Sequence, residues 1–353
     1  MLFHNTRPTR RALRAGAIGA MAVSVALVAA GCATTSSTPA ASGAATGGSG
    51  NYAITFVPKN LGNAYFDASD KGGAAAITEF GGKYSEVGPA TASPDAQVSF
   101  INTLTQQQVG GIVISANDPK AIGDSLNEAR AAGIKVVTFD SDTDPSYRDI
   151  FINQASPEGI AKSQVDQIAS QIGDTGEIAI LSASANATNQ NAWIDLMKAD
   201  LAKDHPNIKL DEVVYGDDDD QTSFDKTAAL LQSHPDLKGI ISPTTVGIAA
   251  AARYLSTSSS KGKVALTGLG TPNQMRAYIA DGTVTSFALW NPADLGYLAA
   301  YADKALIDGT ITGKSGDKFT AGKLGSFTVG DKGTVLLGDP TVFNKANIDQ
   351  FNF

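Results

Sequence analysis

The side chains with the most chemistry in this sequence come directly after short apolar runs. They include an ammonium, carboxylates, amides and aromatic rings, and two of the carboxylates, Asp140 and Asp142, are separated by a single residue. A carboxylate or an amide can bond two neighbouring hydroxyls, and an aromatic ring can cover an apolar C–H face. This mixture favours a neutral, polyhydroxylated ligand. The candidate binding residues are Lys59, Phe66, Asp140, Asp142, Asn189, Gln190, Pro243, Thr245, Gly270 and Trp290.

Several candidates also have a purely structural interpretation. Asp140 and Asp142 could cap the turn that follows them, and Trp290 could be a core residue. Asn189 is typical of a helix N-cap. The ligand interpretation is favoured because all the candidates fall at one edge of the expected fold, after the ends of strands.

The elements that must position these residues alternate along most of the chain. Continuous apolar runs such as Ile112-Val113-Ile114 are typical of strands buried on both faces of a parallel sheet. The expected strands are 52–57, 111–114, 135–139, 150–153, 177–181, 212–215, 239–241, 264–267 and 285–289, and the expected helices lie near 64–80, 95–108, 119–132, 157–172, 190–204, 222–233, 246–255, 272–280 and 293–307.

Local signals support these helices. Asp118-Pro119 and Ser156-Pro157 place proline at a first helical position after a capping residue, and Gly81 and Gly133 fall where helices should end. Repeated βα units predict a doubly wound α/β fold. Such sheets bind ligands beyond the carboxyl ends of their strands, which is where the candidate residues lie.

The first 31 residues have the pattern of an export signal. Four arginines and no acid precede an uncharged stretch over 15–30, which is shorter than the roughly 20 residues of a membrane span. Ala29-Ala30-Gly31 and then Cys32, the only cysteine, resemble a bacterial lipobox, so we expect a lipid on Cys32; a plain signal peptide is the alternative. General secretion and twin-arginine export both remain open.

Residues 32–50 are expected to form a flexible tether. Positions 33–50 hold only Ala, Thr, Ser, Gly and Pro, so no side chain there can start a core. The protein is therefore expected outside the cytoplasm, either attached by lipid to the outer face of the cell membrane or periplasmic.

Composition excludes several classes of function. The 353 residues carry a formal charge of −8 without a basic stripe, which argues against nucleic acid as a partner. One cysteine permits no intrachain disulfide and no multi-cysteine zinc site. We expect no metal and no cofactor. The acidic run Asp217 to Asp220 lacks the glycine and glutamate of a calcium loop, so we expect a solvated loop there.

An enzyme and a transcription regulator are the two rival classes. The sequence has no Gly-x-Ser-x-Gly elbow, and His205 and His234 each precede proline at an expected helix end. The segment 309–315 imitates a phosphate-binding loop, but its glycines are too close together and it follows a helix. A regulator would need a basic helix-turn-helix where this chain has its export signal. Neither rival is favoured.

Motifs spread along the chain resemble one known family. They are Phe56-Val57-Pro58-Lys59, Gly88-Pro89, 138–142 (Thr-Phe-Asp-Ser-Asp), Ile152-Asn153-Gln154, 187–193 (Ala-Thr-Asn-Gln-Asn-Ala-Trp), 241–245 (Ile-Ser-Pro-Thr-Thr), 270–276 (Gly-Thr-Pro-Asn-Gln-Met-Arg), 288–291 (Ala-Leu-Trp-Asn) and 343–351. In this order they are similar to the periplasmic sugar-binding proteins of ABC importers, in the branch with rhamnose-binding and autoinducer-2-binding (LsrB-type) proteins.

The resemblance implies two lobes joined by three chain crossings that close over a sugar. Lobe one would be 51–154 plus 291–325, and lobe two would be 155–290 plus 326–353. It also implies a monomer that delivers its sugar to the transmembrane subunits of an ABC permease. Ligand contacts in the autoinducer-2 branch would fall on Lys59, Asp140, Asn189, Gln190, Pro243 and Thr245.

Three positions bear on which sugar is bound. The autoinducer-2 branch has Asp where this chain has Asn189 and Ala where it has Thr245, which favours a rhamnose-like deoxysugar or related polyol over autoinducer-2. Ribose-type proteins place Arg where this chain has Ser141, which disfavours ribose. A role beside a sugar chemoreceptor remains compatible with the sequence.

Overall fold

The computed structural model describes residues 50–353. The expected signal segment, Cys32 and nearly all of the expected tether lie outside the described residues. Within residues 50–353, no helix combines the length and the apolar character that a membrane crossing requires.

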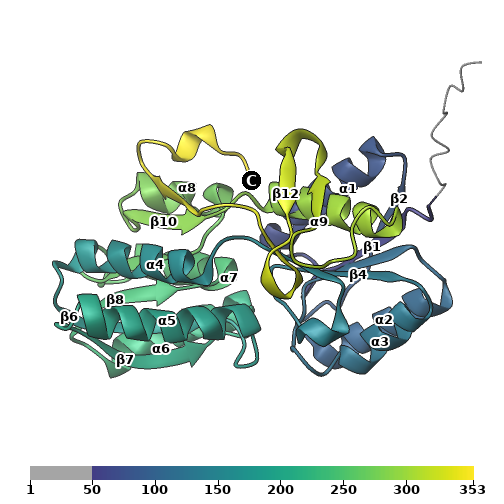
Figure 1. Ribbon diagram of the computed structural model, residues 1–353. Coiled ribbons are helices and arrows are strands. Elements are labelled where there is room, and N and C mark those ends of the chain that lie inside the picture. The colour runs from purple at the N-terminus through teal and green to yellow at the C-terminus, as the bar shows by residue number, and fades with distance from the viewer. Residues whose placement is uncertain (1–49) are drawn as a thin grey trace, which may run out of the picture. The chain divides into compact units, whose positions relative to one another are not determined.

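The first lobe is built on a six-stranded parallel sheet with the order β13-β5-β4-β3-β1-β2. Its strands are β1 (Ala53–Val57), β2 (Lys83–Glu86), β3 (Gly111–Ile114), β4 (Lys135–Phe139), β5 (Ile150–Asn153) and β13 (Thr334–Leu336). Helices α1 (Ala64–Glu79) and α9 (Pro292–Ile307) cover one face, and α2 (Pro94–Gln106) and α3 (Gly123–Ala131) cover the other (Figure 1). The residues of β3 are fully buried, as their continuous apolar run predicted.

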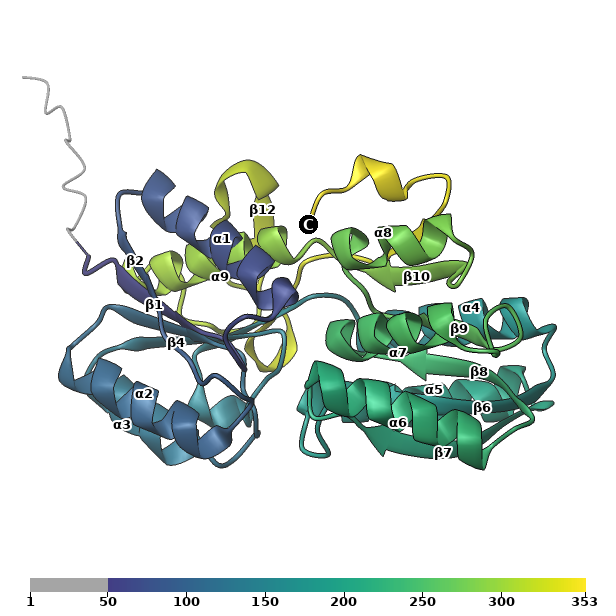
Figure 2. The same cartoon turned by 180° about the vertical axis from the view of Figure 1, so that it is seen from behind.

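The second lobe has a four-stranded parallel sheet with the order β7-β6-β8-β9. Its strands are β6 (Gly176–Ser182), β7 (Ile208–Tyr215), β8 (Leu237–Ser242) and β9 (Ala265–Gly268). Helices α4 (Pro157–Ile172) and α5 (Thr188–Asp204) lie on one face, and α6 (Asp220–Ser233) and α7 (Thr245–Thr257) lie on the other, as the two opposite views show (Figures 1 and 2). The expected doubly wound α/β fold with two lobes is confirmed.

Short elements complete both lobes. Helix α8 (Pro272–Ala280) follows β9, and β10 (Ser286–Leu289) pairs antiparallel with β14 (Thr341–Asn344). A single bridge between Leu269 and Ala288 attaches this pair to the second sheet. β11 (Lys318–Thr320) and β12 (Ser326–Thr328) form an antiparallel hairpin after α9.

The expected division of the C-terminal segment is wrong in part. Residues 326–353 were assigned wholly to the second lobe, but β13 pairs in parallel with β5 of the first lobe, and Val335 is buried there. The third crossing therefore lies between β13 and β14, later than the expected boundary at 325. A strand of three residues whose partner lies far earlier in the chain leaves no local pattern by which to place it.

Helix ends follow local chemistry. Ser156 Oγ accepts from Gly159 N at 3.1 Å with Pro157 in the first turn of α4, as expected. Gly81 and Gly133 have φ of +77° and +90°, conformations that stop a helix and suit glycine. The start of α3 differs from the prediction. Asp118 Oδ1 accepts from Lys120 N and Ala121 N, so it stabilises a turn, and the helix begins only at Gly123.

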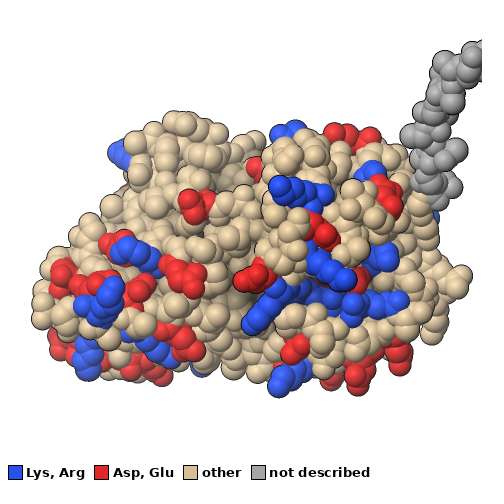
Figure 3. Space-filling view, in the orientation of Figure 1, with Lys and Arg blue, Asp and Glu red and all other residues tan. Residues whose placement is uncertain are grey.

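The charged surface is mixed in sign. Figure 3 shows acidic and basic side chains interspersed over the second lobe and a group of Lys and Arg over the first. Two arginines of the first lobe are paired with acids, Arg130 with Asp149 at 3.0 Å and Arg148 with Asp142 at 2.6 Å. Among residues 50–353, no cluster of three or more His, Cys, Asp or Glu side chains is placed to hold a metal ion.

Candidate functional site

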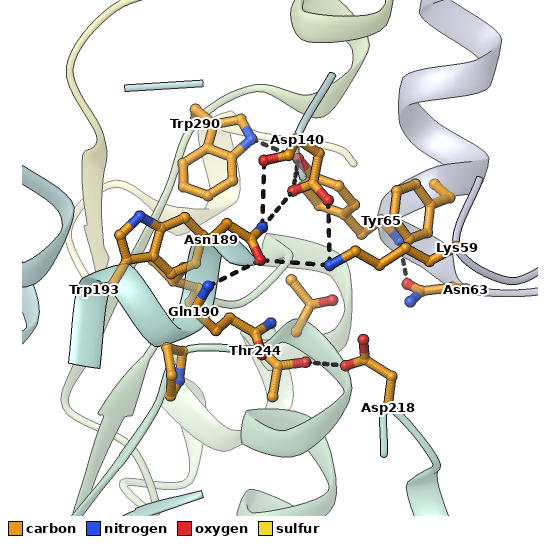
Figure 4. A pocket seen from close by; sticks show the side chains of 14 residues that line it. Lys59, Asn63, Tyr65, Asp140, Asn189, Gln190, Trp193, Asp218, Thr244 and Trp290 are labelled. Carbon is orange, nitrogen blue, oxygen red and sulfur yellow. Dashed lines mark hydrogen bonds and ion pairs between the residues drawn. The ribbon is translucent and has the colours of Figure 1, made fainter. Parts of the chain in front are cut away.

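A cavity lies where loops at the carboxyl ends of strands from both lobes meet, as expected for parallel sheets. The cavity is nearly closed, because the space open to the centre of a water-sized sphere is only about 30 Å³. The lining residues are Lys59, Asn63, Tyr65, Phe66, Asp140, Asn189, Gln190, Trp193, Asp218, Pro243, Thr244, Thr245, Leu269 and Trp290 (Figure 4).

Asp140 is the carboxylate of the first-lobe wall. It follows β4 directly, and its φ of +61° is unusual for a residue with a side chain. Ser115 Oγ donates to Asp140 Oδ2 at 2.8 Å, and Tyr65 OH donates to Oδ1 at 3.2 Å. Only 6% of the residue is exposed, so these donors stabilise a nearly buried anion.

Lys59 and Asn189 connect the two walls. Lys59 Nζ lies 3.8 Å from Asp140 Oδ2 and 3.5 Å from Asn189 Oδ1. The amide nitrogen of Asn189 donates to the main-chain oxygen of Asp140 at 3.3 Å and to its Oδ1 at 3.4 Å. Because Asn189 belongs to the second lobe, these contacts join the lobes across the cavity.

Aromatic rings form the apolar wall. Trp290 packs edge-on against Tyr65 and Trp193, with ring centroids 6.0 and 6.2 Å apart. Its Nε1 donates to Tyr65 OH at 2.9 Å. Phe66 packs edge-on against Tyr65 at 5.1 Å. Trp290 is only 4% exposed and also lines the cavity, so burial in the core and a place in the cavity wall are compatible; its contact with a ligand stays a prediction.

The second-lobe wall consists mainly of neutral polar groups. Gln190 Oε1 accepts from Ser182 Oγ at 3.1 Å and from Ala183 N at 3.0 Å, which directs the side chain from the first turn of α5 toward the end of β6. Pro243, Thr244 and Thr245 follow β8. Thr244 Oγ1 donates to Asp218, which follows β7.

Polar groups behind the first-lobe wall hold its loops in place. Gln97, fully buried on α2, donates through Nε2 to Pro58 O at 3.2 Å and to Ser115 O at 2.8 Å. Asn117 Nδ2 donates to Lys59 O at 2.9 Å. The main-chain groups beside Lys59 and Ser115 are thus fixed before any ligand enters.

Burial changes the proton affinity of two lining residues. It raises the pKa of Tyr65 well above its usual value, and the charge of Asp140 adds to this effect. It also raises the pKa of Asp218, while the charge of Lys59 and the Thr244 hydrogen bond oppose the rise.

Two expected site residues do not line the cavity. Both carboxylate oxygens of Asp142 accept hydrogen bonds from Arg148, at 2.6 and 2.7 Å, and Asp142 is not among the residues that line the cavity. Gly270 lies over the second-lobe core, where a Cβ atom would meet Met275 at 2.8 Å, and Leu269 lines the cavity in its place.

Asn189 also differs from its expected helix role. The N-cap of α5 is Ala187, and the helix starts at Thr188. Asn189 therefore lies within the first turn, with its side chain free to reach Lys59 and Asp140. The other expected residues, Lys59, Phe66, Asp140, Asn189, Gln190, Pro243, Thr245 and Trp290, all line the cavity; their contact with a ligand stays a prediction.

Six lining residues were not among the candidates: Asn63, Tyr65, Trp193, Asp218, Thr244 and Leu269. Tyr65 and Thr244 adjoin candidates and could have been found from the same loops. Trp193 is one helical turn from Gln190, a spacing that places the two residues on one face. Asp218 was hidden in the acidic run: Asp217, Asp219 and Asp220 are exposed as expected, whereas Asp218 is half-buried and lines the cavity.

The arrangement is suited to binding. Acceptors and donors converge on the space next to aromatic walls, as a ligand with several hydroxyls requires. The two histidines of the described region lie elsewhere, His205 beside Asp174 and His234 beside Glu212. The loop at 309–315 already binds one of the protein's own carboxylates, because Asp317 accepts hydrogen bonds from Thr312 N and Lys314 N.

Comparison with known proteins agrees with this geometry. Residues 54–311 match the periplasmic binding protein domain. Three solved structures are similar to the chain. A sugar ABC transporter from Actinomyces odontolyticus is 54% identical and covers 85% of this chain and 97% of its own, with a TM-score of 0.70. An ABC transporter solute-binding protein from Clostridium phytofermentas with bound L-rhamnose is 39% identical and covers 84% and 97%, with a TM-score of 0.82.

The third structure is LsrB from Clostridium saccharobutylicum in complex with AI-2. It is 27% identical and covers 85% of this chain and 99% of its own, with a TM-score of 0.80. The resemblance inferred from the motifs is therefore confirmed for the family. These relatives bind substrates and do not transform them. The chain belongs to the periplasmic binding protein family, an exported family, and is a binding protein and not an enzyme.

Proposed function

We propose that this protein binds a neutral sugar, a rhamnose-like deoxysugar or a related polyol, and delivers it to the permease of an ABC importer. The observation that carries the proposal is the cavity itself, where a buried carboxylate, an ammonium and two amides face aromatic rings. The 39% identical relative with bound L-rhamnose and the 54% identical sugar ABC transporter support it.

The first-lobe wall supplies the strongest polar contacts in this proposal. Asp140 already has donors on both oxygens, and a carboxylate oxygen can accept more than one hydrogen bond. It would accept from sugar hydroxyls, and Lys59 would donate to a hydroxyl or ring oxygen. Hydrogen bonds to charged groups contribute about 1.5–3 kcal/mol each, so two of them supply much of a micromolar affinity.

The aromatic wall would recognise the apolar part of the sugar. Trp290, Trp193 and Phe66 present rings to the cavity. A deoxysugar carries a methyl group in place of one hydroxyl, and burying that methyl against rings is favourable, whereas burying an unpaired hydroxyl is costly. The sugar with the methyl group is thereby preferred.

Closure of the lobes would couple binding to transport. Lys59 and Asp140 lie on one lobe, and Asn189 and Gln190 on the other, while the chain passes between lobes after β5, β10 and β13. A ligand that contacts both walls shifts the population toward the closed form. The permease then distinguishes the loaded from the open protein by shape.

Autoinducer-2 is the second candidate ligand, for uptake or signalling. The 27% identical LsrB in complex with AI-2 supports it. The contacts of Asn189 favour the first candidate. Its amide donates to Asp140, whereas the aspartate of the autoinducer-2 branch would repel Asp140 at that distance.

A panel of ligands tests the proposal. The thermal midpoint of the purified protein would be measured with L-rhamnose, D-arabinose, D-ribose, short polyols and autoinducer-2. A ligand at a hundredfold excess over its Kd stabilises the protein by about 2.7 kcal/mol, a rise of several degrees. A rise with L-rhamnose or a polyol supports the proposal. A rise with autoinducer-2 alone supports the second candidate, and no rise with any of them contradicts both.

We also propose that a lipid on Cys32 anchors the protein. The support is the lipobox-like segment before this single cysteine. Fractionation of cells that express the parent or Cys32→Ser tests it. The parent should sediment with membranes and the variant should be soluble; a variant that still sediments contradicts the anchor.

A further inference from the structure

We propose that Asp218 is a specificity-determining residue, the carboxylate with which the second lobe accepts a hydroxyl from the face of the sugar opposite Asp140. The inference rests on the proposed sugar-binding function and extends it to a ligand class: neutral sugars with hydroxyls on both faces. Figure 4 shows Asp140 and Asp218 on opposite sides of the Lys59 side chain.

Of the four residues in the acidic run, only Asp218 lines the cavity, and the backbone conformation of this turn places it there. Asp217 and Asp218 have φ of +56° and +51°, and the turn is held by Asp217 N donating to Ala183 O at 3.1 Å and Asp219 N donating to Gly216 O at 2.9 Å. Such a conformation is costly for a residue with a side chain, and it is found mostly where the surrounding structure enforces it.

The neighbouring acids have other roles. Asp219 Oδ1 accepts from Thr222 N at 2.7 Å as the N-cap of α6. Asp220 pairs with Arg253 on the surface, and Asp217 is exposed. Capping and surface pairing therefore account for Asp219 and Asp220, but neither accounts for Asp218.

The carboxylate of Asp218 is held from one side. Thr244 Oγ1, on the adjacent loop after β8, donates to its Oδ1. Its other oxygen accepts no hydrogen bond from residues 50–353. One oxygen is thus oriented by the protein and the other is available to a donor in the cavity, which is the arrangement expected for an acceptor of a ligand hydroxyl.

The charges around Asp218 restrict the ligand. The charged groups that face it are Lys59 and Asp140 from the first lobe and Asp217 from its own loop. With two carboxylates and one ammonium on its walls, the cavity repels an added negative charge. Sugar phosphates and sugar acids are therefore disfavoured relative to neutral sugars.

Closure brings Lys59, the cation that faces Asp218 among the described residues, close to its carboxylate. Burial raises the pKa of Asp218, and the charge of Lys59 lowers it again. Because Lys59 belongs to the first lobe, the ionised form of Asp218 is favoured when the lobes approach. Asn189 fits the same scheme, since it donates to Asp140 as an amide and leaves the second carboxylate of the cavity at Asp218.

The test compares Asp218→Asn with Asp217→Asn, the exposed neighbour in the same turn. Asn tolerates positive φ, so both variants should keep the fold. Calorimetric titration would use the neutral sugar of the panel that stabilises the parent most. Asp218→Asn should lower its affinity at least tenfold, whereas Asp217→Asn should stay within twofold. Thr244→Val, which keeps the charge but removes its donor, should cause a severalfold loss.

The outcomes separate this inference from the proposed function. If the parent binds a neutral sugar and Asp218→Asn binds it as well as Asp217→Asn does, the role of Asp218 is refuted and the sugar-binding function stands. If Asp218→Asn does not fold, unchanged affinity in Thr244→Val refutes the role instead. If no neutral sugar binds the parent, both proposals fail together. A loss of at least tenfold in Asp218→Asn and a severalfold loss in Thr244→Val, with Asp217→Asn within twofold of the parent, supports the inference.

Discussion

The two lobes of this protein bury different kinds of polar side chain. Among residues 50–353, the buried acidic and basic residues are Lys59, Asp70, Asp140, Arg148 and Asp303, and all belong to the first lobe. The second lobe buries neutral groups, among them Gln164, Ser182, Gln190, Ser242, Thr245 and Thr267. Both lobes have the same doubly wound architecture, so the fold does not dictate the difference.

The difference indicates separate tasks for the two walls. A buried charge must be fixed by partners within its own lobe, as Ser115 and Tyr65 fix Asp140. Neutral amides and hydroxyls cost less to expose and to bury again when a cleft opens and closes. The first lobe is thus a preorganised recognition surface, and the second lobe is the one that approaches and completes the site.

The largest expected effect comes from removing the charge at the centre of the first-lobe wall. Asp140→Ala should weaken sugar affinity by about 1000-fold, because two charge-assisted hydrogen bonds to the ligand are lost at about 1.5–3 kcal/mol each. Gln190→Ala, on the opposite wall, should weaken it only about tenfold. Calorimetric titration of both variants measures the contrast, and equal losses would refute the division of tasks.

A site residue could be predicted from the sequence where a local element, such as the end of a strand or the start of a helix, positions it. The end of a buried strand directs Asp140, and the start of α5 directs Gln190, so apolar runs and turn signals were enough to place both. Asp142 was misplaced because its direction is decided by Arg148, six residues later, which no periodicity reports. Asp218 was missed because an acidic run is usually solvated, and only the positive φ of this turn points one of its members inward.

Contacts between segments far apart in the sequence were the second kind of feature that the sequence could not predict. Most strands of the two sheets were visible as apolar runs. The polar edge strand β2 was not, and β13 has only three residues and joins β5 from a distant part of the chain. Tyr65 shows the same limit within the site. Its position at the start of α1 was evident, but its bond to Trp290, 225 residues away, exists only in the fold.

The second-largest effect should fall on stability and not on binding. Asp142→Ala leaves Arg148, which is 4% exposed, without its carboxylate, and an unpaired buried charge costs about 3–5 kcal/mol. Denaturant unfolding should report this loss, and sugar affinity of the folded protein should change less than threefold. Asp144→Ala, on the exposed side of the same loop, is the control. A large loss of affinity without a loss of stability would restore Asp142 to the binding site.

The third prediction concerns pH and the first lobe. Asp70 is 2% exposed on α1, and burial, with the charge of Glu86, raises its pKa to about 8. The folded state therefore holds its proton more tightly than the unfolded state, whose pKa is about 3.9. This contribution to the free energy of unfolding is complete below about pH 4 and is lost as the pH rises toward and through 8.

Asp70→Asn should flatten that slope, which amounts to a few kcal/mol between pH 5 and 8 on the scale of about 1.4 kcal/mol per pKa unit. Asp67→Asn, an exposed position on the same helix, should leave most of it in place. Denaturant unfolding at a series of pH values makes the comparison. A slope that persists in Asp70→Asn would mean that the burial of Asp70 is not what makes the stability depend on pH.

The smallest expected effect tests whether the hydrogen bonds around Asp140 extend to Trp290, where the chain crosses between the lobes. Tyr65→Phe removes the hydroxyl that accepts from Trp290 Nε1 at 2.9 Å and donates to Asp140 at 3.2 Å. The buried indole N–H is then left unpaired, at a cost of about 1–3 kcal/mol, so affinity should fall about tenfold. Both tryptophans of the chain line the cavity, so their emission should also shift. Tyr84→Phe, which removes a hydroxyl bonded to Glu86 away from the cavity, should change neither. If Tyr65→Phe behaves like Tyr84→Phe, the hydrogen bond from Tyr65 does not help to hold Asp140, and the preorganised surface of the first lobe does not extend to Trp290.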